Sequence, residues 1–493
     1  MQGVKGRFSL FRPDLITVFM VEMWERFAFY GGRAVLVLFL ISPAAQNGLG
    51  LADASATSIY GLYTAMALLL GLLAGWVSDA YIGARSSVAL GGILILTGNT
   101  MLSAGAYFSN PPLVYSGLAC DALGIAFLKP NASSLVAQLY PDGGAERDAG
   151  FLIFYTGISI GALVGSLAIP LLAARFGWWA GFASTSVGML IGLIQFYLRS
   201  HHLRNVGLPV KDNETMKASR KSIVYSILLS GVAILMVLQI DISLPALVEI
   251  ISWLMVAVAF IYFTYLVTRP DVDTQARKRM FALILLCIGL SLYLVGYHQG
   301  GSSLNIFTER FTDREIWGWE IPAGVFQSII PFASIIFAPV FAILWVQLGA
   351  RGIVPSSIIK FGVALLLMGL GFLIMTRASA NAAEMGKVLP VWLVCTFVVH
   401  TFADLFIAPI GLSAASKLAP PNRLAQTIGL WFVFGAIGNA LSGVLAGKMD
   451  LTDAARLSES FYDVFLLGLI SALAMFALVP FYRRLCGGRS QVV

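Results

Sequence analysis

The stretch EMWERFAFYGGR, which begins at residue 22, carries the charges best placed to do chemistry. Apolar runs flank it on both sides, LITVFMV before and AVLVLFLI after. Its helical spacing puts the charges on one broad face. An ionised side chain inside a membrane costs about 2.5–3.5 kcal/mol, so such residues face a watery cavity or pair with one another. The stretch therefore predicts a polar functional site within a membrane, formed by Glu22, Glu25, Arg26 and Arg33.

Three further ionisable residues in other apolar segments are expected to meet this face. Lys129, in IAFLKPNASS, is the obvious counter-ion. At about 1.5 Å rise per residue, Lys129 lies level with the two glutamates, and His298 lies level with Arg33. The same rise per residue places Asp404 near the midplane of the membrane. The pattern predicts a central polar cavity with a second charged layer nearer the outer face.

The composition supports a membrane setting for these charges. The chain has 493 residues, of which 58% are hydrophobic and only 12% charged. Serial apolar runs of about 20 residues indicate an all-α membrane protein with about fourteen transmembrane helices. The expected helices lie near 14–43, 55–77, 86–108, 112–138, 149–174, 178–199, 222–240, 244–268, 279–305, 321–347, 353–377, 388–418, 423–447 and 459–483.

Charge in the connections predicts orientation. Basic residues gather before the first helix, after the sixth, before the ninth and at the C-terminus. By the positive-inside rule both termini face the cytoplasm, as an even number of spans requires. We therefore expect a multi-pass protein of the cell (inner) membrane. The net charge of +7 needs no nucleic-acid partner, because these loops account for it.

The long polar segment at 201–222 divides the chain. We expect an N-terminal bundle of six helices at 1–200, a linker with two extra helices at 201–278, and a C-terminal six-helix bundle at 279–493. The tripeptide Gly-Ala-Arg follows the second helix of each half, in DAYIGAR and in WVQLGAR. This recurrence favours a transporter-type duplication. The four cysteines have no metal-ligand spacing, and no phosphate-binding loop is present, so we expect no metal, no cofactor and no ATP motor.

Several motifs resemble one known family. EMWERFAFYGGR is similar to the ExxERFxYY signature of the proton-coupled oligopeptide transporters, within the major facilitator superfamily. GWVSDAYIG, FLKPNASSLVAQLY, RDAGFLIFYTGISIGA, QGGSSLN, EIPAGVFQS and GLWFVFGAIGN resemble further family blocks in the family's order. The resemblance implies the major facilitator fold, a symporter driven by the proton gradient, peptide or peptide-like substrates, protons and membrane lipid as partners, and a functional monomer.

The resemblance also implies roles for single residues. Glu22, Glu25, Arg26 and Lys129 would couple protons. His298 departs from the family pattern, and we expect its protonation to affect closure of the outer gate, because the protonated imidazole would repel Arg33. The implied substrate-binding residues are Arg26, Tyr30, Arg33, Lys129, Ser159, Asp404 and Trp431.

Departures from the family pattern fall at the end of the site that holds a peptide's amino group. Ser159 and Ile330 replace asparagines, Asp404 replaces a glutamate, and His298 replaces the glutamate that pairs with the Arg33 position. The carboxylate end is kept. Substrates are therefore expected to be di-/tripeptides or peptide-like carboxylates, with a non-peptide organic or inorganic anion, or export of a peptide-like metabolite, as alternatives.

An intramembrane enzyme is the alternative from another class. His400 and Asp404, in HTFAD, share a helix face at i, i+4, as acid–base chemistry would require. No nucleophile is evidently paired with them, so we expect no enzyme activity.

Overall fold

The computed structural model describes residues 12–141, 144–208, 244–270, 272–407, 414, 417–419 and 424–487. Each range expected to be helical contains a helix, except 222–240, which lies outside the described residues. Ten helical segments of the described part are long and apolar enough to cross a membrane. Two of them, Asp53–Tyr107 and Thr274–Phe311, each comprise two α-helices. The prediction of a mostly helical membrane protein is confirmed.

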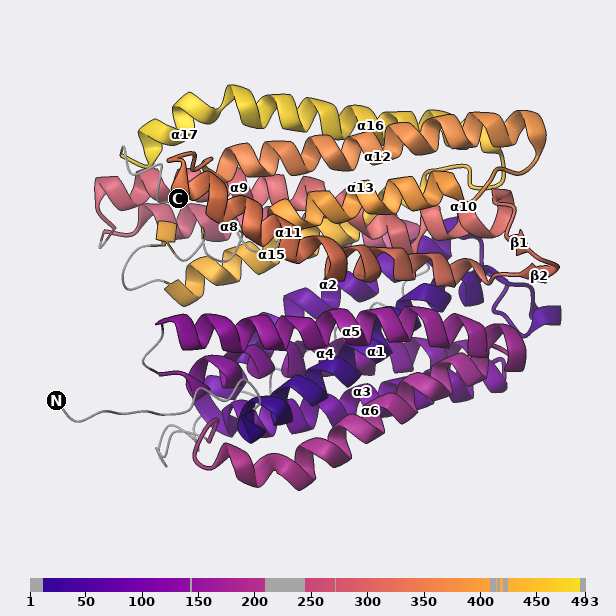
Figure 1. Ribbon diagram of the computed structural model, residues 1–493, viewed down its shortest axis with the longest axis horizontal. Helices are drawn as coiled ribbons and strands as arrows, with labels where there is room; N and C mark the ends of the chain where they lie inside the picture. The colour runs from indigo at the N-terminus through magenta and orange to yellow at the C-terminus, as the bar shows by residue number, and fades with distance from the viewer. Residues whose placement is uncertain are drawn as a thin grey trace.

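The N-terminal bundle occupies the lower half of Figure 1. Proline stands in the first turn of its first and fourth helices, where a missing N–H is tolerated. Asn110 caps the fourth helix by accepting a hydrogen bond from the Leu113 amide at 3.1 Å. The helices are α1 (Pro13–Ile41), α2 (Asp53–Val77), α3 (Gly83–Tyr107), α4 (Pro111–Leu139), α5 (Gly144–Phe176) and α6 (Trp178–Arg199).

The C-terminal bundle forms the upper half of Figure 1, together with one described helix of the insert, α8 (Leu244–Thr268). A short β-hairpin, β1 (Glu315–Ile316) and β2 (Trp319–Glu320), marks one end of the molecule. We call this the hairpin end, and the end where α1 begins the terminal end. The remaining helices are α9 (Thr274–Tyr297), α10 (Ser303–Phe311), α11 (Ile329–Ala350), α12 (Ser357–Met385), α13 (Val391–Ile407), α15 (Leu424–Gly447), α16 (Ala454–Ala477) and α17 (Val479–Leu485).

One helix boundary differs from the prediction in a way that matters for the site. The helix expected over 279–305 is interrupted, because α9 ends at Tyr297 and a 3-10 turn at His298–Gly301 precedes α10. Two successive glycines, which weaken helices, fall in this turn. The apolar pattern runs through the turn, so hydropathy alone did not reveal it.

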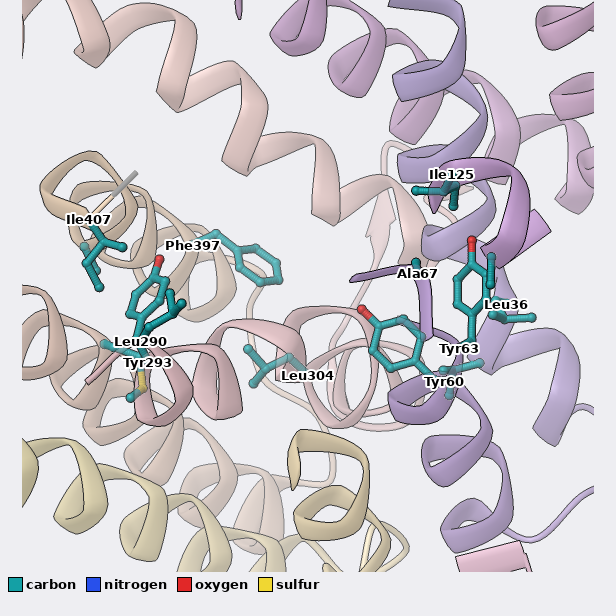
Figure 2. Packing of buried hydrophobic residues seen from close by; sticks show 14 of the residues in the cluster. Leu36, Tyr60, Tyr63, Ala67, Ile125, Leu290, Tyr293, Leu304, Phe397 and Ile407 are labelled. Atoms are coloured by element: carbon teal, nitrogen blue, oxygen red, sulfur yellow. The ribbon is translucent and has the colours of Figure 1, made fainter. Parts of the chain in front are cut away.

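The two bundles meet closely at the hairpin end. A Cβ atom on Gly61 of α2 would lie 2.6 Å from the Gly443 Cα of α15, so only glycine allows these helices to cross this closely. Asn439 of α15 donates to the Thr64 carbonyl of α2 at 3.0 Å. In Figure 2, Tyr60 and Tyr63 of α2 lie on one side of the view and Tyr293 of α9 on the other. The crossing of α2 and α15 therefore joins the bundles.

Replacing Gly61 tests this crossing. Gly61→Ala should force α2 and α15 apart and destabilise the closed hairpin end by about 1–3 kcal/mol, as overpacking does. Spin labels at two exposed residues would report the separation: Phe108, which directly follows α3, and Trp317, which lies between β1 and β2. Gly71→Ala is the matched control, because nothing lies within 4 Å of its added Cβ. Equal distance distributions in both variants would contradict the prediction.

Candidate functional site

The charged residues of α1 form a closed cluster. Arg26 Nε lies 3.3 Å from Glu22 Oε1 and is also hydrogen-bonded to Glu25 Oε2. Both glutamates are 1% exposed and Arg26 is 3% exposed. One oxygen of each glutamate and Arg26 Nη2 are buried without a hydrogen-bond partner. Two carboxylates thus share one guanidinium, which places Glu22, Glu25 and Arg26 together on the helix face that the spacing predicted.

Glycines of α5 set the position of this cluster. A Cβ atom on Gly161 would collide with the Met23 carbonyl of α1, and one on Gly165 would collide with the Phe27 carbonyl. These two glycines, one turn apart, let α5 lie directly against the backbone of α1. Arg26 is therefore held between its own helix and α5.

Lys129 lies apart from the cluster but within reach of its charges. Its side chain is exposed, whereas the glutamates are not. Glu22, Glu25 and Arg26 all act on it electrostatically, but Lys129 makes no ion pair with a described residue. A lysine that reaches solvent beside buried acids is placed to meet a charged solute. The expected meeting of Lys129 with the two glutamates is thus an electrostatic interaction without direct contact.

Arg33, two turns beyond Arg26 on α1, is a buried guanidinium without an acidic partner among the described residues. It is 3% exposed, and its Nε and Nη2 atoms have no hydrogen-bond acceptor. The guanidinium carbon lies 5.3 Å from the Tyr297 ring centroid and 5.9 Å from that of Tyr30. A Cβ on Gly301 would lie 2.4 Å from the Tyr60 hydroxyl and 2.9 Å from Arg33 Nε, so a larger residue in the 3-10 turn would displace these side chains. The unpaired fork of donors fits a carboxylate or another anion.

His298 stands in the same turn but does not pair with Arg33. Its Nδ1 lies 3.2 Å from the Tyr60 hydroxyl, and the imidazole is 7% exposed. The positive charge of Arg33 acts on it. The predicted layer containing Arg33 and His298 therefore exists, with Tyr60 as an added member.

The remaining predicted substrate residues lie on three helices. Asp404 of α13 is half-buried and accepts a hydrogen bond from the Tyr293 hydroxyl at 3.2 Å. Ser159 of α5 donates to the Tyr155 carbonyl of its own helix at 3.3 Å. Trp431 of α15 is buried and packs edge-on against Phe361. Their predicted contacts with substrate stay predictions.

His400 and Asp404 do not form an acid–base pair. The His400 ring lies against α12, where its Nε2 is 3.2 Å from the Met368 carbonyl. Asp404 instead contacts Tyr293 of α9. The two side chains are directed at different helices, so the enzyme alternative loses its best geometric support.

Comparison with known proteins gives the family. A family model described as the POT family matches residues 85–460. "Peptide transporter YePEPT" of Yersinia enterocolitica is 31% identical over 493 residues, covering 97% of this chain and 96% of its own. The di-/tripeptide transporter of Lactococcus lactis is 31% identical and covers 87% and 88%. The chain belongs to the POT family.

Solved structures agree with the assignment to the POT family. A crystal structure of a peptide transporter POT in complex with sulfate has a TM-score of 0.86 at 30% identity, covering 98% of this chain and 97% of its own. A POT family transporter in complex with 5-aminolevulinic acid has a TM-score of 0.84 at 29% identity, covering 95% and 96%. The fold is that of the major facilitator superfamily, and the family consists of transporters rather than enzymes.

The sequence prediction for this POT-family site missed one buried acid. Asp121 of α4 is 4% exposed and accepts hydrogen bonds from Tyr63 at 2.6 Å and Asn99 at 3.0 Å. It stands in YSGLACDALGIAF, an otherwise apolar run, so the signal that drew attention to Glu22 was present here too.

A pocket of about 530 Å³ lies elsewhere, where α1 begins and α4 ends. Arg12, Asp14, His201 and His202 are among its lining residues, and Arg12 is already paired with Asp14 at 2.7 Å. None of the predicted site residues lines it, so it is not the site described above.

Substitutions at His298 test the layer around Arg33. His298→Glu would give Arg33 a carboxylate partner, so we expect firmer closure at the hairpin end and slower transport. His298→Gln keeps a neutral hydrogen-bonding group beside Tyr60 and should remove the imidazole's contribution to the pH–rate profile. Uptake by proteoliposomes between about pH 5 and 8 measures both. If neither variant changes the profile, His298 has no role in gating.

Proposed function

We propose that this POT-family chain is a proton-coupled symporter that carries di-/tripeptides or peptide-like carboxylates by alternating access. The observation that carries the proposal is the arrangement around α1, where a buried acid cluster lies beside an exposed lysine and an unpaired arginine. The names of the curated relatives, a peptide transporter and a di-/tripeptide transporter, support the substrate class.

Charge balance provides the coupling. Glu22 (−1), Glu25 (−1) and Arg26 (+1) sum to −1, which the nearby charge of Lys129 balances. A substrate carboxylate that binds Lys129 withdraws this charge from the glutamates. One glutamate then binds a proton more tightly, because an unbalanced buried carboxylate is costly. Substrate and proton binding thereby become linked, and the linkage is reciprocal.

The contacts between the bundles support one state of the cycle. At the hairpin end, Arg310 forms a two-pronged ion pair with Asp53 at 2.6 and 2.9 Å, and Asn305 donates to the Ala34 carbonyl at 2.9 Å. Lys129 nevertheless reaches solvent. We infer that the cavity opens toward the terminal end, which we assign to the cytoplasm of a bacterial inner membrane from the placement of basic residues. The single chain contains both bundles, so a monomer suffices.

Removing single charges tests the coupling. Glu22→Gln, Glu25→Gln and Lys129→Ala should each reduce proton-driven accumulation by about 5–150-fold, the range that a coupling free energy of about 1–3 kcal/mol gives. Accumulation of labelled peptide in proteoliposomes with an imposed proton gradient measures this. Glu249→Gln is the matched control, because Glu249 is only partly buried and pairs with exposed Lys448, away from the cluster. Full accumulation in all three variants would refute the mechanism.

The substrate site favours a carboxylate over an amino group. Arg33 and Lys129 offer cationic donors that no described acid occupies. On the other side, Asp404 is a single half-buried acid that already accepts a hydrogen bond from Tyr293. Peptide-like carboxylates without a free amino group, and other anions, therefore fit the site, and transport of such an anion is the second candidate function.

Modified dipeptides separate the two ends. Amidating the carboxyl terminus of Ala-Ala removes the charge that Arg33 and Lys129 would bind, and should weaken binding by about 10–150-fold, at about 1.5–3 kcal/mol for a hydrogen bond to a charged group. Acetylating the amino terminus should cost less than this. Titration calorimetry with Ala-Ala and both analogues measures the difference, with sulfate and nitrate testing the anion alternative. A larger loss on acetylation would contradict the prediction.

A further inference from the structure

The Asp121 carboxylate is an acid of the N-terminal bundle that the mechanism above does not use. It lies about two turns before Lys129 on α4 and is 4% exposed. In the described part of the chain its two oxygens meet neutral donors alone, the Tyr63 hydroxyl at 2.6 Å and the Asn99 amide at 3.0 Å. Burying an ionised carboxylate without a cation is costly, so this group is a candidate to bind a proton.

The neighbours of Asn99 decide which oxygen would carry the proton. Asn99 Nδ2 also donates to the Ile95 carbonyl at 3.0 Å, and its Oδ1 accepts from Thr185 at 2.8 Å. These two partners orient the amide so that an N–H faces Asp121 Oδ1. A proton on the acid therefore belongs on Oδ2, which faces Tyr63.

Tyr63 can serve both protonation states. A phenol hydroxyl donates one hydrogen bond and accepts others, so it can donate to the carboxylate or accept from the carboxylic acid. The separation of 2.6 Å suits either direction. Figure 2 shows Tyr63 extending from α2 on the side where Ile125 of α4 lies. The site can gain or lose a proton while its packing stays the same.

The site is also in electrostatic contact with the cluster of α1. Glu25 acts on both Tyr63 and Asp121, and Arg26 acts on Asp121. Side-chain contacts also connect the cluster with Tyr63. Phe29 packs against the Arg26 guanidinium, and its ring centroid lies 6.4 Å from that of Tyr63. A change of charge at Glu25 therefore changes how tightly Asp121 binds a proton.

We propose that Asp121 is a second proton-binding site, which holds one proton on Oδ2 against Tyr63 and whose occupancy depends on the charge of the Glu22–Glu25–Arg26 cluster. The proposal rests on the proton-coupled function proposed above. The groups that face Asp121 are Tyr63 from α2, Asn99 from α3 and, at longer range, Glu25 and Arg26 from α1. The acid takes the proton from water and returns the same proton to water, so no other reactant is needed.

Infrared difference spectroscopy of the full chain in lipid nanodiscs tests the proposal. A pH step should reveal the carbonyl band of a protonated carboxylic acid. We expect Asp121→Asn to abolish this band and Tyr63→Phe to shift its frequency, because the acid O–H on Oδ2 loses the hydroxyl that accepts its hydrogen bond, while the carbonyl oxygen Oδ1 keeps Asn99. Protons released per transporter on the alkaline step should fall by one in Asp121→Asn. Asp404→Asn is the matched control, since this second acid also bonds a tyrosine but should not affect the Tyr63-sensitive band.

The possible outcomes separate the two proposals. If the wild-type chain accumulates peptide with protons and every carboxylic acid band survives in Asp121→Asn, Asp121 is a structural residue and this inference is wrong. If a protonophore leaves wild-type accumulation unchanged, the proposed function itself fails. Should Asp121→Asn not fold, the Tyr63→Phe spectrum decides, because an unshifted spectrum overturns the proposal and a shifted band supports it.

Discussion

The cost of leaving an ionised group unbalanced in a membrane interior governs this structure. The N-terminal bundle nevertheless buries two glutamates and two arginines on one helix and an aspartate on another. Buried ion pairs are often no more stable than apolar packing of the same size, so stability alone does not account for them. What they provide is a protonation state that responds to nearby charge, because a charge added or removed nearby changes the electrostatic energy of every other charged residue in the cluster. Coupled transport needs this property.

Close backbone approach is the second condition. Gly161 and Gly165 bring α5 onto α1 beside the acid cluster, and Gly301 brings the 3-10 turn onto Arg33. Gly61 and Gly443 do the same where the bundles meet. Small residues at helix contacts are how membrane helices pack when lipid supplies no hydrophobic driving force. The glycines thus hold the charged side chains at distances where their charges interact.

The sequence predicted the features that depend on periodicity and composition. The helices, the shared face of Glu22 and Arg26, and the common level of Arg33 and His298 all follow from helical geometry. The break at His298–Gly301 did not, because it depends on how Arg33 and Tyr60 pack against the turn and not on hydropathy. The hydrogen-bond partner of each polar atom could not be predicted from the sequence either, since contacts between helices determine side-chain orientation. His400, for example, is directed at the Met368 carbonyl of α12 and not at Asp404, one turn away on its own helix.

The unpaired Arg33 changes what closure at the hairpin end depends on. Where an acid from the other bundle faces this position, an ion pair contributes to holding the bundles together. Here the Tyr30 and Tyr297 rings lie beside the guanidinium, and such contacts are worth about 0.5–2 kcal/mol each. Closure then relies on Arg310 with Asp53 and on the packing of α2 against α15. Arg33 keeps two donors, Nε and Nη2, without an acceptor in the described part of the chain, and both lie beside the glycines of the 3-10 turn. At the hairpin end this chain therefore brings its two bundles together without an acidic partner for Arg33 among the described residues.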